Sequence, residues 1–272
     1  MYTENLTISA VKSQKIFDVN LIFFNGSHVR AKPEDFNSKI FEETNKHNIV
    51  VLKNFLSADE VTNLKKQTTE LKEKYNSERI TYSKNCRDFH HLEFNNEEDD
   101  ERRVREGRQK RPRRFYLYKF LPWNFRNKLF EKSVNDIIKL RNTFYENQNL
   151  YNNYINIPQI LHYRQGGDFL AEHKDIVFHS KQGLSSHIEI ITLLSDIGKS
   201  FIKGGLFIRT KKNKVIHVEN YCKSGDLVLY NVSNPHGCSP IDEYYISSAK
   251  LNLEGRYSML VPPYKKSMYL KN

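Results

Sequence analysis

The chain has 272 residues, of which 38% are hydrophobic, and it contains 17 phenylalanines and 16 tyrosines. This aromatic content excludes a disordered chain and predicts a folded protein with a substantial core. The formal net charge is +11, from 43 basic and 32 acidic side chains. It allows a polyanionic partner, but lysines scattered through ordinary segments fit a solvated surface better.

Cysteine use and apolar runs bear on the compartment. Cys86, Cys222 and Cys238 form no CxxC pair, so neither a zinc ribbon nor a thioredoxin-like site is indicated. A low, odd cysteine count is typical of a reducing compartment. The N-terminus lacks a secretory pattern, and no apolar run reaches the roughly 20 residues of a membrane span. We therefore expect a soluble, cytoplasmic protein without a membrane partner.

The N-terminal part, residues 1–150, predicts helices with a few short strands. The run 20–26 (NLIFFNG) is strand-like, a helix is expected around 33–48, and Ile49–Phe55 is a short apolar strand. Apolar residues at helical spacing predict a long helix near 126–147.

A helix start is predicted after the second of these strands. Ser57 and Glu60 have the spacing of a capping box, in which each residue satisfies a backbone N–H of the other. Val61, Leu64 and Leu71 then recur at helical spacing and mark one buried face.

A charged segment occupies residues 95–114. Five acids, Glu97 to Glu101, precede a stretch rich in Arg and Lys from Arg102 to Arg114, and such a composition cannot be buried. The aromatic run 115–118 should pack onto the core. Two interpretations stay open, a solvated surface loop or a lid that orders when substrate arrives. The acids would repel phosphates, so a nucleic-acid partner is not expected.

From Ile157 onward, short runs rich in Ile, Val, Leu and Tyr are separated by Gly, Asn, Pro and Ser. They are QILHYR, IEIITLLS, GLFIRT, KVIHVE, DLVLYNV and RYSMLVP. This pattern is typical of an all-β sandwich or barrel. Helices first and strands later predict a single domain, 1–272, with a helical part (1–150) packed on a β core (151–272).

Two histidines and one aspartate have the pattern of a metal site. The segment HYRQGGDFLAEHKD delivers His173 and Asp175 two positions apart, and in an extended chain such residues share a face. His236 follows a later predicted strand. Two imidazoles and one carboxylate leave three positions open on octahedral iron, as in non-haem iron(II) oxygenases. A structural zinc would instead need four protein ligands.

A pair of residues near the C-terminus suits a carboxylate ligand. Arg256 and Ser258 lie two positions apart in a strand-like run, so their side chains share a face. An arginine fork beside a hydroxyl can hold a carboxylate through two hydrogen bonds.

With these motifs, the sequence resembles the 2-oxoglutarate- and iron(II)-dependent dioxygenases, nearest to their prolyl-hydroxylase-like branch. The matching segments are His173-x-Asp175, Gly204-Gly205-Leu206, Gly225-Asp226, His236-Gly237 and Arg256-x-Ser258. The resemblance is firm over about 157–262 and loose over 45–75, and residues 95–150 match nothing comparable.

The resemblance implies a mainly β fold with flanking helices (α+β), a double-stranded β-helix or jelly-roll core with an N-terminal helical layer. It implies that His173, Asp175 and His236 are the catalytic residues and bind Fe(II). It also implies that Arg256, helped by Ser258, binds the distal carboxylate of 2-oxoglutarate, and that Tyr163 touches the same group. O₂ would be the second cosubstrate, and the reaction the hydroxylation of an unactivated C–H bond.

The substrate is less defined. No docking module for a macromolecule is visible, which favours a small polar metabolite such as a free amino acid. A peptidyl or protein residue as substrate, and a non-catalytic jelly-roll that binds nucleic acid, are the alternatives. The oligomeric state stays open.

Other polar residues are expected to have structural roles. Glu172 should point away from its neighbour His173, and Arg164 and Arg209 should form surface ion pairs rather than bind an anionic substrate. The remaining candidate histidines are His90, His91, His162, His179, His187 and His217. Of these, His179 and His187 could face the substrate, whereas His217 fits a surface or core position.

Overall fold

The computed structural model of the protein describes residues 12–74, 89–94, 112–120, 127–145, 150–184, 187–243 and 253–269. Most of the charged segment, and with it the candidate lid, lies outside these described residues. None of the described helices is long and apolar enough to cross a membrane.

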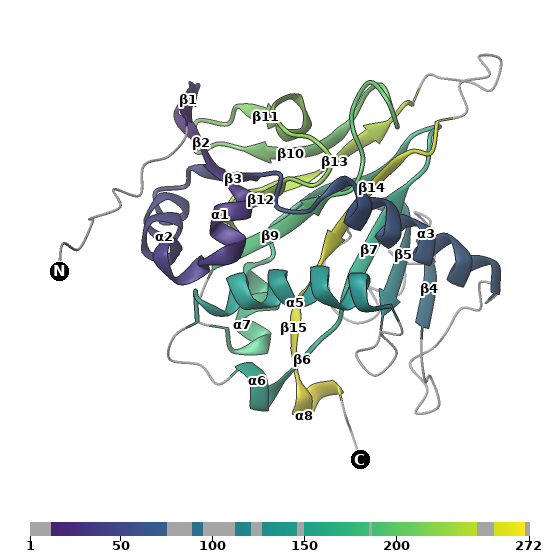
Figure 1. The fold of residues 1–272 in the computed structure, drawn as a ribbon. Helices are drawn as coiled ribbons and strands as arrows, with labels where there is room; N and C mark the ends of the chain where they lie inside the picture. The colour runs from purple at the N-terminus through teal and green to yellow at the C-terminus, as the bar shows by residue number, and fades with distance from the viewer. Residues whose placement is uncertain are drawn as a thin grey trace.

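Strands form most of the molecule, and thirteen of the described ones join one hydrogen-bonded sheet (Figure 1). Their order is β1-β2-β3-β12-β9-β14-β7-β5-β8-β13-β10-β11, and β4 pairs with β5. The strands are β1 (Lys12–Ile16), β2 (Val19–Asn25), β3 (Ile49–Lys53), β4 (Phe89–Phe94), β5 (Arg113–Phe120), β7 (Gln159–Tyr163), β8 (Asp168–His173), β9 (Ile188–Leu193), β10 (Gly205–Arg209), β11 (Val215–His217), β12 (Leu227–Asn231), β13 (His236–Ile241) and β14 (Arg256–Leu260). A separate pair joins β6 (Tyr154–Asn156) and β15 (Pro263–Lys265).

The sheet folds back on itself into a nearly closed jelly-roll. One core cluster joins side chains of β2, β3, β9 and β12 to Leu206, Ile208 and Ile216 of β10 and β11. A second joins β5 and β7 to Cys238 and Ile241 of β13. The double-stranded β-helix expected from the sequence is therefore confirmed.

Helices cover the outer face of the first half of the sheet (Figure 1). Val29, Ile40, Leu64 and Phe130, from four helices, share one core cluster with apolar residues of β3, β9 and β12. This is the predicted helical layer. The helices are α1 (Gly26–Ala31), η1 (Pro33–Asp35), α2 (Asn37–Asn45), α3 (Ala58–Lys74), α5 (Lys128–Asn142), α6 (Leu150–Asn153), α7 (Ile176–Gln182), η3 (Val218–Tyr221) and α8 (Lys266–Tyr269).

The part before residue 150 also contributes five strands to the sheet, more than its sequence pattern indicates. Strand β5 pairs with both β7 and β8 and so connects the two halves. Its side chains alternate between two core clusters. Phe115 and Leu117 belong to the cluster shared with β7 and β13, and Tyr118 and Phe120 belong to the cluster under the helices. The expectation that this run packs onto the core is confirmed.

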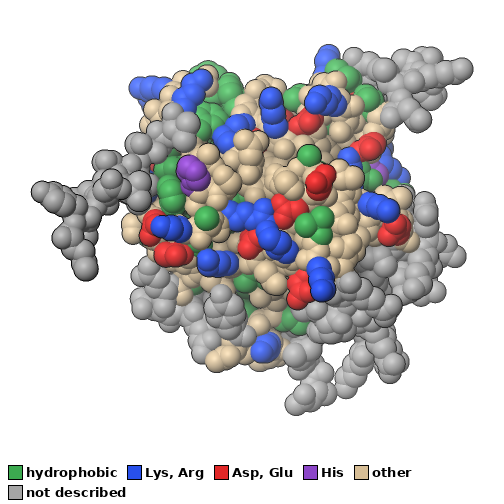
Figure 2. All heavy atoms as spheres, in the orientation of Figure 1, with side chains coloured by type: hydrophobic (Ala, Val, Ile, Leu, Met, Phe, Trp, Pro, Cys, Tyr) green, Lys and Arg blue, Asp and Glu red, His purple; other side chains and the backbone are tan. Residues whose placement is uncertain are grey.

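Charged side chains on the helical face are mixed in sign. Figure 2 shows Lys and Arg interspersed with Asp and Glu over the described part of this face. Such mixing fits a solvated surface.

The capping box at the start of α3 is formed as predicted. The backbone N–H of Ser57 donates to Glu60 Oε2 (2.9 Å), and that of Glu60 donates to Ser57 Oγ (3.2 Å). The Glu60 carboxylate also accepts two hydrogen bonds from Arg30, at 2.7 and 2.5 Å. Burial opposes ionisation of Glu60, but the bonds from Arg30 and Ser57 prevail and lower its pKa to about 2.

Glu60→Ala is expected to lower the free energy of unfolding by about 3 kcal/mol, because it removes the cap and leaves the half-buried Arg30 without this partner. Urea unfolding followed by circular dichroism measures this change. Asp59→Ala, which removes an exposed acid in the same helical turn, should cost less than about 1 kcal/mol. Equal losses for the two variants would contradict a structural role for the Arg30–Glu60 pair.

Candidate metal centre

Two antiparallel neighbours bring the candidate histidines together. His173 ends β8, His236 begins β13, and the two residues are paired directly across the strands. Their ring centroids lie 4.3 Å apart. Strand pairing therefore brings together two histidines that are far apart in sequence.

Asp175 joins this pair from a turn. After His173 the chain leaves the strand, and Asp175 precedes helix α7 with φ −97° and ψ 9°. Its Oδ2 lies 3.4 Å from His173 Nε2 and 3.2 Å from His236 Nε2. The expectation of one extended segment was wrong in this detail, because α7 begins directly after Asp175. The side chain makes no capping hydrogen bond to that helix.

In each of the two histidines, the hydrogen bond made by Nδ1 orients the imidazole ring. His173 Nδ1 lies 2.8 Å from the Ala171 carbonyl oxygen, and His236 Nδ1 lies 2.9 Å from that of Asn234. Because a carbonyl oxygen only accepts, both Nδ1 atoms carry a hydrogen, so in the neutral imidazoles it is the Nε2 atoms facing Asp175 that can bind a metal. His47 Nδ1 contacts Asn234 Oδ1 at 2.6 Å and steadies the turn before His236.

The donor set fits a divalent cation. One ligand atom from each of His173, Asp175 and His236 lies within 4.8 Å of the others. Two nitrogen lone pairs and an anionic oxygen facing one another repel unless a cation separates them. Two imidazoles and one carboxylate are the ligand set of non-haem iron.

A cavity of about 210 Å³ opens beside these three residues, as enclosed by the described part of the chain. Its walls are largely apolar, with Leu161, Ile191 and Leu206 among them. The polar residues that line it besides the three candidate ligands include Arg113, Gln159, Tyr163, Glu189, Tyr230, Arg256, Ser258 and Tyr264. Such a concave site, with apolar walls and polar groups that can orient a ligand, is the usual form of a small-molecule site.

Arg256 is the buried cation of this cavity. It lies opposite Tyr163 in the pairing of β14 with β7, and its guanidinium carbon is 5.3 Å from the Tyr163 ring centre. Nη1 donates to Ser258 Oγ (3.0 Å), so the two side chains share a face as predicted. Nε donates to Glu219 Oε1 (2.6 Å). Burial alone would lower the pKa of Arg256, but the Glu219 charge outweighs it and raises this pKa above its usual range.

Tyr230 also lines the cavity, and unlike Arg256 it was not singled out from the sequence. Its ring meets His236 edge to face at 4.9 Å, and its buried hydroxyl has no hydrogen-bond partner among the described residues. Burial raises the pKa of Tyr230 well above its usual value, so the hydroxyl stays protonated. It can donate a hydrogen bond to a bound molecule.

Most other candidates from the sequence have structural roles. Glu172 points away from the cavity and forms an ion pair with Arg209 at 2.5 Å, as expected. Arg164 pairs with Asp168 at 2.8 Å. His217 is exposed.

The remaining histidines differ in their surroundings. His162 stacks on Tyr257 with ring centroids 4.0 Å apart. His187 is exposed, and His179 is buried with its Nε2 3.4 Å from Glu189. The side chains of His90 and His91 lie outside the described residues.

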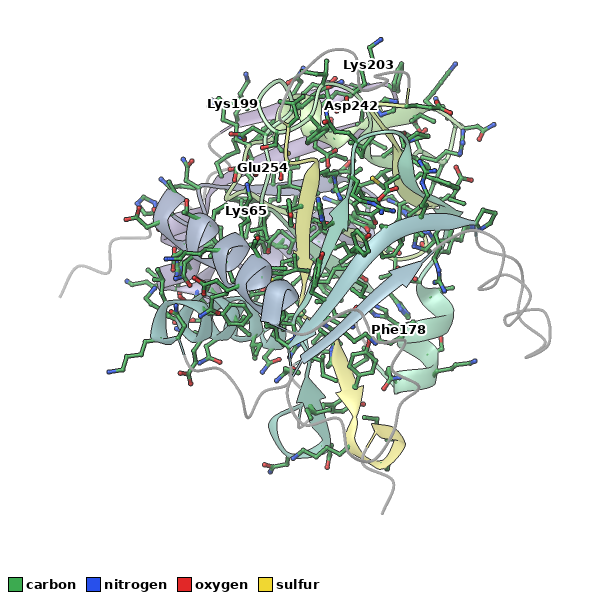
Figure 3. The ribbon with its side chains drawn as sticks, turned by 90° about the vertical axis from the view of Figure 1, so that its right-hand side faces the viewer. Lys65, Phe178, Lys199, Lys203, Asp242 and Glu254 are labelled. Atoms are coloured by element: carbon green, nitrogen blue, oxygen red, sulfur yellow. The ribbon has the colours of Figure 1, made fainter. Side chains whose placement is uncertain are left out.

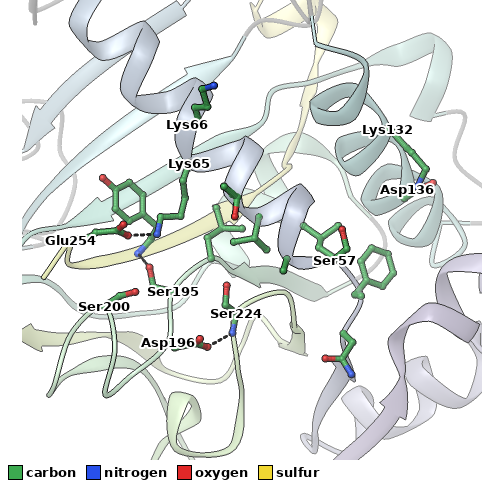
Figure 4. Close-up of a pocket in the computed structure, with 18 of the residues that line it drawn as sticks. Ser57, Lys65, Lys66, Lys132, Asp136, Ser195, Asp196, Ser200, Ser224 and Glu254 are labelled. Carbon is green, nitrogen blue, oxygen red and sulfur yellow. Dashed lines mark hydrogen bonds and ion pairs between the residues drawn. The ribbon is translucent and has the colours of Figure 1, made fainter.

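A larger groove of about 1350 Å³ lies on the other side of β14, between α3 and the 194–200 loop (Figures 3 and 4). Tyr257, which lies between Arg256 and Ser258 in sequence, lines this groove and not the cavity. Charges in the groove are paired locally, as in the contact of Lys65 with Glu254 (Figure 4). None of the three candidate metal ligands lines it.

Comparisons with known proteins support the fold. No protein-family model and no curated protein sequence matches the chain. A prolyl-4-hydroxylase from Pseudomonas putida superposes with a TM-score of 0.54 at 13% identity, over 85% of this chain and 99% of that one. A non-heme alpha-ketoglutarate-dependent epimerase from nogalamycin biosynthesis gives 0.50 at 9% identity, over 86% and 84%. A Trichoplax adhaerens prolyl hydroxylase gives 0.47 at 12% identity, over 88% and 94%. The first two comparisons show that the chain shares the fold of the P. putida prolyl-4-hydroxylase and of the epimerase.

Proposed function

We propose that the protein is a 2-oxoglutarate- and iron(II)-dependent oxygenase, in which residues 1–272 act as a single domain. The observation that carries this proposal is the convergence of two imidazole Nε2 atoms and one carboxylate beside a cavity that also holds a buried arginine. Two structures that share the fold are, by their names, a prolyl-4-hydroxylase and an alpha-ketoglutarate-dependent epimerase.

His173, Asp175 and His236 would hold the iron in this proposal. The metal, with 2-oxoglutarate and O₂, supplies the oxidising chemistry, and the products are succinate, carbon dioxide and an oxidised substrate. The protein contributes the two Nδ1 hydrogen bonds that orient the imidazoles. Its apolar walls exclude water from the reaction.

Arg256, Ser258 and Tyr163 would bind the distal carboxylate of 2-oxoglutarate. Arg256 carries the charge, Ser258 holds its Nη1, and Tyr163 lies across the strand pair from it. All three side chains line the cavity that also contains the candidate metal ligands. In this proposal one 2-oxoglutarate molecule spans the cavity, with one end at the metal and its distal carboxylate at Arg256.

The substrate class that we propose is a small polar metabolite such as a free amino acid. The cavity is small, and its lining includes one cation, Arg113, and one anion, Glu189, besides the residues assigned above. Opposite charges in one small cavity suit a zwitterion. The alternative is a peptidyl residue, as the name of the P. putida protein suggests.

The protein with Fe(II) and 2-oxoglutarate, without O₂, is expected to develop a weak visible charge-transfer band, and in air it should release succinate when its substrate is present. A screen of free amino acids, proline-containing peptides and nucleotides, scored by succinate, identifies the substrate class. Stimulation by peptides alone would replace the amino-acid proposal with the peptidyl one. The absence of both the band and succinate would refute the oxygenase proposal.

A further inference from the structure

Arg256 is hydrogen-bonded to an acidic residue, Glu219, that does not line the cavity. Glu219 belongs to η3, between β11 and β12, and its side chain is 3% exposed. Arg256 lines the cavity, whereas Glu219 is absent from the lining. The guanidinium therefore has two sides, one facing the cavity and one held by Glu219.

Gly205 makes room for this acid. Its φ is +103°, and a Cβ at this position would lie 2.8 Å from both Cδ and Oε2 of Glu219. Oε2 has no hydrogen-bond partner among the described residues. The buried carboxylate thus depends on one strong contact, from Arg256 Nε to Oε1 at 2.6 Å.

The hydrogens of Arg256 leave capacity for a second anion. A guanidinium has five N–H groups. Nε donates to Glu219 and Nη1 donates once to Ser258. The N–H groups that remain are enough for a carboxylate arriving from the cavity to accept two hydrogen bonds.

We propose that Glu219 is an internal counter-anion that shares Arg256 with the distal carboxylate of the cosubstrate and thereby weakens cosubstrate binding. This inference rests on the proposed function. While the cavity is empty, Glu219 compensates a buried cation that would otherwise destabilise the fold. Once 2-oxoglutarate binds, two anions face one cation in a site of low dielectric, and their repulsion reduces the affinity.

Glu219→Gln separates these two effects, because glutamine keeps the size and an oxygen acceptor but removes the charge. We expect the variant to bind 2-oxoglutarate roughly tenfold more tightly than the wild type. Calorimetric titration with Mn(II) in place of iron measures this without turnover. The Tm without 2-oxoglutarate should fall, and its rise on adding 2-oxoglutarate should be larger than in the wild type.

Two controls isolate the charge at Arg256. A 2-oxo acid of the same length without the distal carboxylate, 2-oxopentanoate, should show no gain in affinity. Glu172→Gln makes the same substitution on the surface, at a residue paired with Arg209, and should leave 2-oxoglutarate binding unchanged. If Glu219→Gln does not fold, Glu219→Asp keeps the charge but withdraws it from Arg256, and a smaller gain in the same direction is expected.

Unchanged or weaker 2-oxoglutarate binding in the variant, with normal binding by the wild type, would overturn this inference and leave the proposed function standing. A tenfold gain shared by 2-oxopentanoate would also overturn it, because the effect would then not involve the distal carboxylate. Failure of the wild type and the variants alike to bind 2-oxoglutarate would overturn the proposed function together with this inference.

Discussion

His173→Ala and His236→Ala are each expected to abolish metal binding and turnover while the protein stays folded. Each substitution removes one of the two Nε2 donors that converge on Asp175, so two ligand residues are left, too few to hold the metal firmly. The rings contribute to the wall of a cavity, and the sheet is held by backbone pairing and by separate apolar clusters.

Metal affinity is measured by Mn(II) titration, activity by succinate release, and folding by circular dichroism. His217→Ala, which removes an exposed histidine of β11, is the matched control and should leave all three unchanged. Normal activity of His173→Ala or His236→Ala at limiting iron would contradict the assignment of the metal ligands.

Arg256→Ala is expected to raise the KM for 2-oxoglutarate by about two orders of magnitude, with little change in metal affinity. Losing one partner of a buried charge pair costs roughly 2–5 kcal/mol, which corresponds to a factor between about 30 and about 5,000 and so brackets the expected change. Arg164→Ala, which removes an arginine paired with Asp168 outside the cavity, is the control for general loss of charge. A change of less than a few-fold would mean that another cation holds the cosubstrate.

Arg256→Ala should also lower the Tm, since Glu219 becomes an unpaired buried anion. Adding Glu219→Gln to Arg256→Ala should recover much of the Tm without restoring 2-oxoglutarate binding. This separates the structural from the binding contribution of Arg256.

Much of the fold was predictable because burial leaves a periodic trace in the sequence. The capping box at Ser57 and six strands after residue 157 (β7, β9, β10, β11, β12 and β14) follow local patterns, and the structure has them where expected. Strand β13, which begins with His236, was not among the expected strands. Arg256 and Ser258 were placed on one face by their spacing alone, which their hydrogen bond confirms.

The parts that escaped prediction depend on partners far away in sequence. Glu219 ends the strand-like run KVIHVE, and its partner Arg256 is 37 positions later, so nothing local indicates the pair. Tyr230 reads as one more apolar residue of β12, and only the folded sheet brings it against His236. The turn at Asp175 was missed because the pattern of alternation does not report where a strand gives way to a helix.

The pairing of β3 with β12 limits how the protein can be divided. β12 is buried along its whole length and is flanked by β9 on one side and β3 on the other. A fragment beginning at residue 151 would keep the three candidate metal ligands but lose β3. It would expose β12 as an apolar edge strand with unpaired backbone groups, to which strands of other molecules can bind. Aggregation, rather than a smaller working enzyme, is the expected fate of such a fragment.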